Sequence, residues 1–119
     1  MSLIEQFHEI GHVYNDLKLD NICVGTFGLN DKKCQLKLID FGIATSYVTT
    51  EGKFKKPSDP SHHIKLERRL FNGNMGFCSP NQLKKKATSR RDDLYSILFI
   101  LMYLTNNKLP FFDDSLPIN

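Results

Sequence analysis

The apolar positions predict a helix near each end of the chain. Within residues 2–10 the apolar side chains at 3, 4, 7 and 10 follow helical spacing, and Gly11 stands where a helix commonly ends. Residues 94–104 are apolar at every position except Ser96. Because this run is too short to span a membrane, we expect a helix buried in the middle of a domain. Ser89 and Asp92 have the spacing of a capping box at its start.

Between the two helices the pattern predicts a small β-hairpin and a long irregular segment. Residues 21–25 are brief and apolar, and residues 34–40 alternate apolar with polar side chains, so both are strand candidates. The intervening GLNDKK at 28–33 has the composition of a hairpin turn. Residues 45–88 hold half of the Lys, Ser, Thr, Asn and Gly residues of the chain and three of its five prolines, and we expect them to be irregular. The predicted fold is mainly α with a small β-hairpin.

The composition of the chain indicates a single globular unit and a cellular compartment. The chain has 119 residues, 40% of them hydrophobic, which is typical of one globular unit. No window approaches the roughly 20 apolar residues of a membrane span, and the N-terminus lacks the pattern of a signal peptide. Its three scattered cysteines favour a reducing compartment. We expect an intracellular protein of the cytoplasm, the nucleus or both, with no membrane partner.

The charges are unevenly distributed along the chain. The net charge is +3, but residues 51–91 carry +8, between −2 before them and −3 after them. A basic middle suits acidic or phosphorylated partners, although a solvated lysine-rich loop would look the same. It lacks the interleaved aromatic residues of a base-stacking surface, so nucleic-acid binding is not favoured.

Three segments carry the candidate chemistry: YNDLKLDN at 14–21, LKLIDFG at 36–42 and SRRDDL at 89–94. Asp16, Leu17 and Asn21 have the spacing of the D-L-x-x-x-N motif, and Asp40-Phe41-Gly42 follows 19 residues after Asn21. In this pair of motifs, with a predicted hairpin between them, the chain resembles a protein kinase. Any one of these residues alone would fit an ordinary turn.

The resemblance implies a role for each polar residue of the set. Asn21 and Asp40 offer the hard oxygen ligands that Mg²⁺ prefers, and Mg²⁺ would bridge the phosphates of ATP. Asp16 would accept the hydrogen bond of the substrate hydroxyl, and Lys18 would bring positive charge to the transferred phosphate. The cofactor-binding candidates are Asn21, Asp40, Phe41 and Gly42.

The third segment narrows the family. SRRDDL followed by YSILFILMYLTNNKLPF is similar to the stretch that opens the central helix of casein kinase 1 enzymes, and Gly73, Ser79 and Asn81 also match that family. The resemblance implies a protein Ser/Thr kinase that transfers the γ-phosphate of ATP to hydroxyls of acidic or pre-phosphorylated proteins. It also implies two supporting residues: Asp93, a buried carboxylate that accepts backbone N–H bonds of the 14–21 loop, and Tyr14, in place of a His.

The resemblance covers residues 3–111 but only part of a kinase domain. The sequence shows no glycine-rich loop, no strand lysine and no partner glutamate, all features of the N-terminal lobe. We therefore interpret 1–119 as a C-terminal-lobe fragment with the catalytic loop, the DFG motif, the activation segment and the central helix. The N-terminal lobe and the last helices would be absent, and we expect little or no turnover from the isolated chain.

Several positions depart from the family pattern. Asn15 replaces an Arg that in many kinases answers an activation-segment phosphate, Asn74 replaces a Thr that touches the catalytic loop, and Gly76 replaces an anion-binding Arg. Leu98 replaces a small Gly in the central helix. The missing strand lysine and the residues Asn15, Asn74 and Gly76 support a second interpretation, a kinase-like interaction module without turnover.

A more remote interpretation comes from HEIGH at 8–12, which matches the H-E-x-x-H zinc motif. In that case His8 and His12 would bind zinc and Glu9 would act as the general base. Because Gly11 is expected to end the helix before His12, the two imidazoles would be separated.

Overall fold

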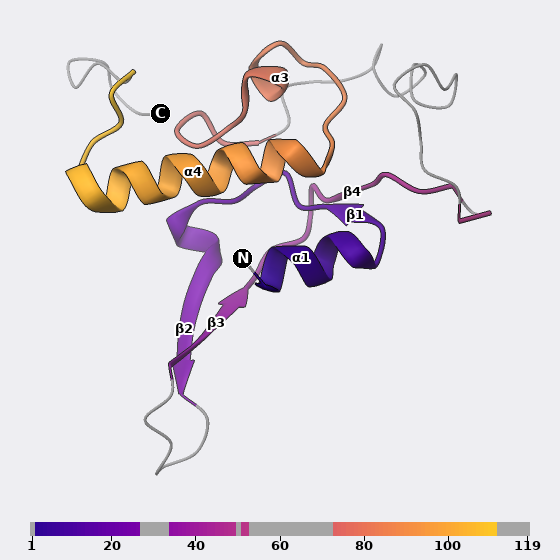
Figure 1. Ribbon diagram of the computed structural model, residues 1–119, viewed down its shortest axis with the longest axis horizontal. Helices are drawn as coiled ribbons and strands as arrows, with labels where there is room; N and C mark the ends of the chain where they lie inside the picture. The colour runs from indigo at the N-terminus through magenta and orange to yellow at the C-terminus, as the bar shows by residue number, and fades with distance from the viewer. Residues whose placement is uncertain (1, 27–33, 50, 53–72, 112–119) are drawn as a thin grey trace.

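Two longer helices and two small sheets make up the described part of the chain. The computed structural model describes residues 2–26, 34–49, 51–52 and 73–111. In chain order the elements are α1 (Ser2–Glu9), β1 (His12–Val13), the 3-10 turn η1 (Leu19–Asn21), β2 (Ile22–Thr26), β3 (Cys34–Leu38), β4 (Thr45–Ser46), α3 (Pro80–Leu83) and α4 (Arg90–Asn106). Figure 1 shows α4 lying across the molecule, with α1 and the projecting β2–β3 hairpin on one side and α3 on the other.

The ends of both longer helices follow the sequence signals. Ser89 and Asp92 form the predicted capping box at the start of α4, and Asn107 ends this helix in the left-handed conformation, with φ of 56°. α1 ends at Glu9, and Gly11 follows with φ of 92°. A Cβ atom at Gly11 would lie 2.6 Å from Cγ2 of Val48, so glycine is needed for both conformation and space.

The strands form two antiparallel pairs. β2 and β3 confirm the predicted hairpin strands, with Ile22 opposite Leu38 and Cys23 opposite Lys37. The predicted turn at 28–33 lies outside the described residues. β1 and β4, in which Val13 lies opposite Thr45, were not predicted, because two-residue strands leave no period in the sequence.

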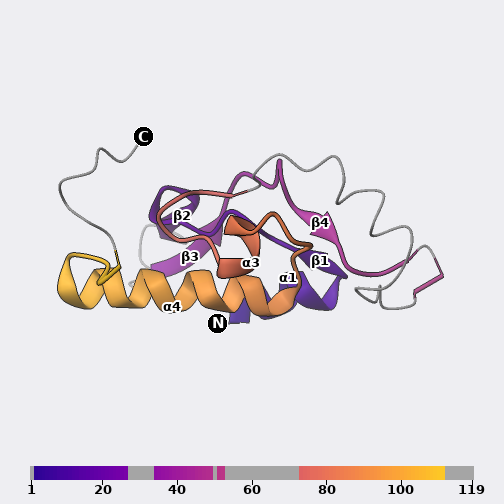
Figure 2. The ribbon, with the colours of Figure 1, turned by 90° about the horizontal axis from the view of Figure 1, so that it is seen from above.

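The core is small and lies where α1, the loop after β1 and α4 meet. Its buried members are Ile4, Tyr14, Leu17 and Ile100. Burying one such side chain stabilises the fold by about 1.5–3 kcal/mol. Figure 2 shows the strands and α3 on one side of α4, and Ile100 of this helix belongs to the core.

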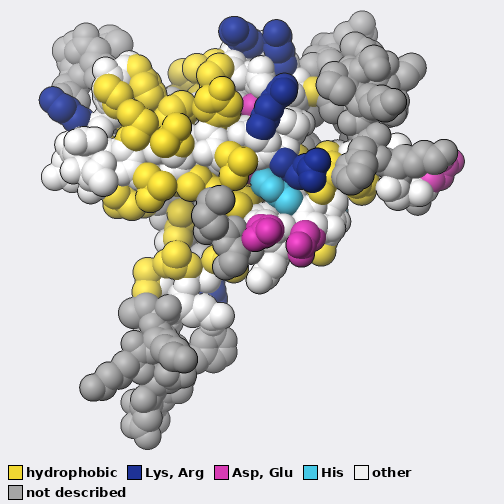
Figure 3. Space-filling view, viewed as in Figure 1, with side chains coloured by type: hydrophobic (Ala, Val, Ile, Leu, Met, Phe, Trp, Pro, Cys, Tyr) yellow, Lys and Arg dark blue, Asp and Glu magenta, His cyan; other side chains and the backbone are white. Residues whose placement is uncertain are grey.

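The prediction that α4 is buried all round is wrong for the described residues. Leu94, Leu98, Leu101 and Leu104 are 46–58% exposed, whereas Ser96 and Ile100 on the other face are buried. The helix packs against β1 and α3. Because these contacts cover one face only, the other face leaves hydrophobic side chains at the surface along α4 (Figure 3).

The prediction of an irregular segment at 45–88 needs a smaller correction. It contains β4 and the four-residue helix α3, while residues 53–72 lie outside the described part. α3 has a signal that the composition argument overlooked: Ser79 and Gln82 form a capping box, with Pro80 at the first helical position. Within the described ranges, the helices are too short or too polar to cross a bilayer.

Candidate functional site

Asp93, at the beginning of α4, fastens the 14–21 loop to this helix. Its side chain is 1% exposed and accepts hydrogen bonds from the backbone N–H of Tyr14 at 2.8 Å and of Asn15 at 2.9 Å. His8 Nε2 lies 2.7 Å from Asp93 Oδ2, so α1 joins the same carboxylate. A buried carboxylate is tolerated when its oxygens are satisfied in this way, and the helix N-terminus favours its charge. The two residues directly before Asp16 are thereby fixed to the beginning of α4.

The contact of His8 with Asp93 was missed in the sequence, where His8 counted only as a zinc-ligand candidate. The structure separates the two halves of HEIGH: α1 ends at Glu9, and His12 lies in β1 with its Nδ1 3.2 Å from the carbonyl of Ile10. The two imidazoles therefore do not share a helical face. Among the described residues, no three His, Cys, Asp or Glu side chains surround a common metal position.

Both carboxylate oxygens of Asp16 are held by neutral amides. Asn21 Nδ2 donates to Asp16 Oδ2 at 3.0 Å and to the Asp16 carbonyl at 3.0 Å, while Asn74 Nδ2 lies 3.4 Å from Asp16 Oδ1. Lys18 Nζ lies 3.8 Å from Asp16 Oδ2. Asp16 is 8% exposed, so its orientation is set by these contacts rather than by solvent.

Asn74 keeps a contact that the sequence comparison put in doubt. Besides Asp16, its Nδ2 reaches the carbonyl of Leu17 at 3.1 Å, and its Oδ1 accepts the N–H of Phe77 at 2.7 Å. The amide side chain of Asn74 therefore reaches the 14–21 loop.

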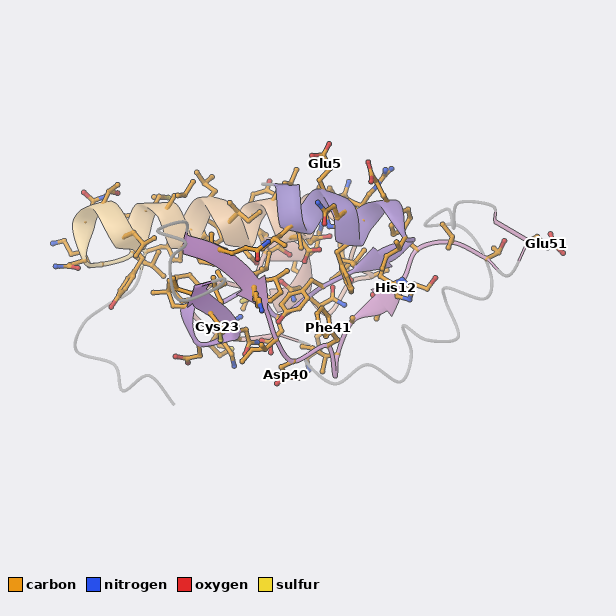
Figure 4. All side chains as sticks on the ribbon, turned by 90° about the horizontal axis from the view of Figure 1, so that it is seen from below. Glu5, His12, Cys23, Asp40, Phe41 and Glu51 are labelled. Carbon is orange, nitrogen blue, oxygen red and sulfur yellow. The ribbon has the colours of Figure 1, made fainter. Side chains whose placement is uncertain are left out.

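The Asp40-Phe41-Gly42 turn begins beside Asn21. The N–H of Ile39 donates to the carbonyl of Asn21 at 3.0 Å, which places Asp40 next to the end of the 14–21 loop. Asp40 has φ of 61°, and its Oδ1 accepts the N–H of Gly42 at 3.2 Å. A Cβ atom at Gly42 would lie 3.2 Å from that oxygen, so glycine leaves room for the carboxylate. Asp40 itself is exposed and lies at the edge of the molecule (Figure 4).

Aromatic packing anchors the same turn. The Phe41 ring lies 5.3 Å from that of Phe7 in α1 and 5.6 Å from that of Tyr14, in an edge-to-face arrangement with Tyr14. Such pairs contribute about 0.5–1.5 kcal/mol beyond their burial. Phe41 remains 50% exposed, and it joins the Asp40 turn to the aromatic residues beside the core.

Tyr14 lies in a buried position where nearby acidic groups raise its pKa. Burial, followed by the negative charges of Asp16 and Asp40, raises the pKa of Tyr14 to about 12, although a hydrogen bond with Asn21 acts in the other direction. Its hydroxyl donates to the carbonyl of Ile39. The negative charges of Asp16 and Asp40 thus both act on one buried phenol.

A second support, α3, was not expected from the sequence. Gln82 Nε2 donates to the carbonyl of Asn15 at 2.7 Å, so the 14–21 loop is held from this side as well. Asp92 ties α3 to α4, because its Oδ1 accepts from Ser79 Oγ at 2.7 Å and from Asn81 Nδ2 at 3.1 Å. Ser79 and Asn81, which match the casein kinase 1 pattern, thus connect α3 to the beginning of α4.

The donor set suits a hard divalent cation. The amide nitrogen of Asn21 donates hydrogen bonds to Asp16, so its Oδ1 can serve as a neutral oxygen ligand. The carboxylate of the exposed Asp40 can serve as an anionic oxygen ligand. These are oxygen ligands of the kind that Mg²⁺ binds together with substrate phosphates.

Comparison with known proteins agrees with this geometry: residues 1–117 match the protein kinase domain. The chain belongs to the protein kinase family. It is 31% identical over 112 residues to a casein kinase 1-like protein of Oryza sativa subsp. japonica, and 30% identical over 110 residues to casein kinase I homolog 2 of Saccharomyces cerevisiae. A putative serine/threonine-protein kinase of Caenorhabditis elegans is 33% identical over 98 residues.

These matches confirm the predicted resemblance to casein kinase 1 and also show its extent. They cover 92%, 92% and 82% of this chain, in the order given, but 15%, 19% and 27% of the relatives. The chain thus spans less than a third of the length of these kinases.

Proposed function

We propose that this chain forms part of the C-terminal lobe of a casein kinase 1-like protein Ser/Thr kinase and carries its phosphoryl-transfer residues. The observation that best supports this proposal is the bond from Asn21 Nδ2 to Asp16 Oδ2. It joins the base candidate to a metal-ligand candidate, and the backbone bond between Ile39 and Asn21 brings Asp40 alongside. Phosphoryl transfer depends mainly on such alignment and on neutralising charge.

In the proposed reaction, Asp16 accepts the hydrogen bond of a protein Ser or Thr hydroxyl and takes its proton. The hydroxyl oxygen forms a bond to the γ-phosphorus of ATP as the bond from that phosphorus to the bridging oxygen of ADP breaks. Lys18, held 3.8 Å from Asp16 Oδ2, supplies positive charge next to the transferred group. Asn21 Oδ1 and the Asp40 carboxylate would hold Mg²⁺, which when bound would neutralise charge on the phosphates.

The protein substrates that we propose are acidic or pre-phosphorylated. Five exposed cations follow α3 or begin α4: Lys84, Lys85, Lys86, Arg90 and Arg91. Figure 3 shows Lys and Arg side chains gathered over this part of the surface. Gln82 of α3 holds the loop that carries Asp16, and a positive surface beside α3 favours the approach of negatively charged segments.

Binding of Mg-ATP to the 119-residue chain tests the metal and nucleotide part of the proposal. We expect weak binding that requires Mg²⁺ and shifts the amide NMR signals of residues 16–21 and 40–42. Asp40→Asn removes the anionic ligand and should abolish these shifts. Asp20→Asn, which changes an exposed carboxylate in η1, is the matched control and should leave them intact. Absence of any shift at millimolar Mg-ATP would contradict the proposal and favour a kinase-like interaction module.

Turnover tests the role of Asp16. In a chain that also carries an N-terminal lobe, Asp16→Asn should lower phosphorylation of an acidic peptide by about 10²–10⁴-fold, the range for losing a general base. Asp20→Asn should keep the activity. Undiminished phosphorylation by Asp16→Asn would exclude this residue as the base.

A further inference from the structure

The side chain of Asn15 connects the base-bearing loop to the segment that follows Gly42. Its Nδ2 donates to the carbonyl of Ile43 at 2.9 Å and to Thr45 Oγ1 at 2.9 Å. We call these two bonds the Asn15 link; Asn15 itself is 2% exposed, and both bonds are partly buried. Thr45 belongs to β4, whose pairing with β1 holds the same segment. The link therefore ties the residue before Asp16 to the beginning of the activation segment.

The backbone of Asn15 is fixed from two further sides. Its N–H donates to Asp93 Oδ1 of α4, and its carbonyl accepts from Gln82 Nε2 of α3. Gly73 packs against this second bond: a Cβ atom there would lie 2.6 Å from Gln82 Nε2 and 3.2 Å from the Asn15 carbonyl. Three parts of the structure thus meet at one residue directly before the proposed base.

Asn15 holds this position at a conformational cost. Its φ is 70°, in the left-handed region that non-glycine residues seldom adopt, although Asn tolerates it better than most. Its Oδ1 is buried and has no hydrogen-bond partner among the described residues. Both features destabilise the folded chain. The two hydrogen bonds donated by Nδ2 offset this cost and are the reason why an amide is favoured at position 15.

The side-chain amide of Asn15 carries no charge, so it cannot form an ion pair with a phosphate on the activation segment. Kinase activation segments are commonly ordered by new pairs between Arg and a phosphorylated residue. An Arg at this position could join such a pair, whereas Asn15 gains little from a phosphate and already binds two acceptors of the unmodified chain. We propose that Asn15 is a positioning residue that fixes Asp16 relative to the activation segment without a phosphate on that segment. This inference concerns the regulation of the proposed kinase site and therefore rests on the proposed function.

The test removes the link without straining the backbone. Asn15→Gly deletes the amide but readily adopts φ of 70°. Asn107→Gly is the matched control, because Asn107 is an exposed asparagine with φ of 56° at the end of α4. In the 119-residue chain, produced free of phosphate as checked by mass spectrometry, we would measure amide hydrogen exchange at Ala44 and Tyr47. Their N–H groups bond to the carbonyls of Phe41 and Gly11, respectively.

In Asn15→Gly we expect exchange at these two amides to become about tenfold faster, while amides in the middle of α4 change less than twofold. The control should change neither region. Unchanged exchange at Ala44 and Tyr47 would overturn the inference, as would an equal rise throughout α4, which would indicate a merely structural role. Protection of these amides that appears only after phosphorylation of the unmodified chain would also overturn it.

A second variant, Asn15→Asp, should change the pH dependence of amide exchange, which a general loss of stability would not do. Asn15→Asp has nearly the same shape, but its ionised carboxylate cannot donate to Ile43 or Thr45, whereas the protonated acid donates one hydrogen bond. Burial beside the negative charges of Asp16 and Asp93 would raise the pKa of this introduced acid. Exchange at Ala44, corrected for its intrinsic pH dependence, should therefore slow as the pH falls through that pKa. A pH-independent ratio to the unmodified chain would count against the link.

The exchange measurement also separates this inference from the proposed function. Fast exchange at Ala44 in Asn15→Gly together with no Mg-ATP binding by the unmodified chain would support the link and contradict the kinase role. Mg-ATP binding with unchanged exchange would retain the kinase role and contradict the inference.

Discussion

The 14–21 loop and the outer face of α4 show opposite relations between polarity and burial. The loop contains two carboxylates and two side-chain amides, yet Asn15, Asp16 and Asn21 are only 2–8% exposed. The outer face of α4 is apolar, yet Leu98 and Leu101 are 51% and 55% exposed. In these two regions, whether a side chain is buried therefore depends on the presence of hydrogen-bonding or packing partners rather than on the hydrophobicity of the segment.

The difference has a physical cause in each region. A polar loop can be buried when its donors and acceptors are paired, as Asp93 and Gln82 pair those of Asn15. An apolar helix face is buried only where another element covers it. Among the described residues, β1 and α3 cover one face of α4, and the stripe around Leu98 is left at the surface.

The largest effect is expected from removing the carboxylate that supports the loop. Asp93→Ala would leave the N–H groups of Tyr14 and Asn15 and the ring of His8 without their acceptor. Loss of one partner from such a buried network costs about 3–5 kcal/mol in the free energy of unfolding, a large part of the stability of a small domain. Urea unfolding followed by circular dichroism would measure this. Asp20→Ala, at an exposed position, is the control; equal effects of the two substitutions would contradict the support by Asp93.

A pair of substitutions on α4 sharpens the comparison within one helix. Ile100→Ala removes a core side chain and should cost about 2–4 kcal/mol, because it leaves a cavity. Leu98→Gln changes a half-exposed side chain and should alter the free energy of unfolding by about 0.5 kcal/mol or less. The same urea titrations would compare both variants. A cost of several kcal/mol for Leu98→Gln would show that this face is covered after all.

A smaller loss than those of Asp93→Ala and Ile100→Ala is expected from the pH dependence of stability through Tyr14. Because its pKa is raised from 10.0 to about 12 in the folded chain, the phenol ionises first in the unfolded chain as the pH rises. Its contribution is fully present below pH 10 and is lost between about pH 10 and 12, by roughly 1–3 kcal/mol. Tyr14→Phe should lack this loss. The stability difference between the two chains, measured from pH 8 to 11.5, should therefore shrink as the pH rises; a constant difference would contradict the pKa shift.

Much of the fold and of the candidate site was predictable because the signals are local in sequence. The capping box of Ser89 and Asp92 and the strands of the β2–β3 hairpin follow from residues close together in the chain. The motif spacing likewise brought Asp16, Asn21 and Asp40 into one hypothesis, and hydrogen bonds join Asn21 both to Asp16 and to Ile39, the residue before Asp40. The site roles themselves remain proposals.

Other features could not be predicted in this way, because they depend on contacts between residues far apart in the chain. His8 and Asp93 are separated by 85 positions, and Gln82 and Asn15 by 67. No period or spacing signals such pairs. α3 is different: its Ser79–Gln82 capping box was present in the sequence but was overlooked within a segment rich in loop residues.

The sequence by itself determined the helix ends, the hairpin strands, the order of the motifs and membership of the protein kinase family, since these depend on local chemistry and spacing. Only the tertiary structure decided which side of α4 is covered and how Asn15, Asn74 and Gln82 hold the loop that carries Asp16. The physical reason is that burial and hydrogen-bond satisfaction belong to pairs of surfaces, and a partner surface is known only once the chain has folded.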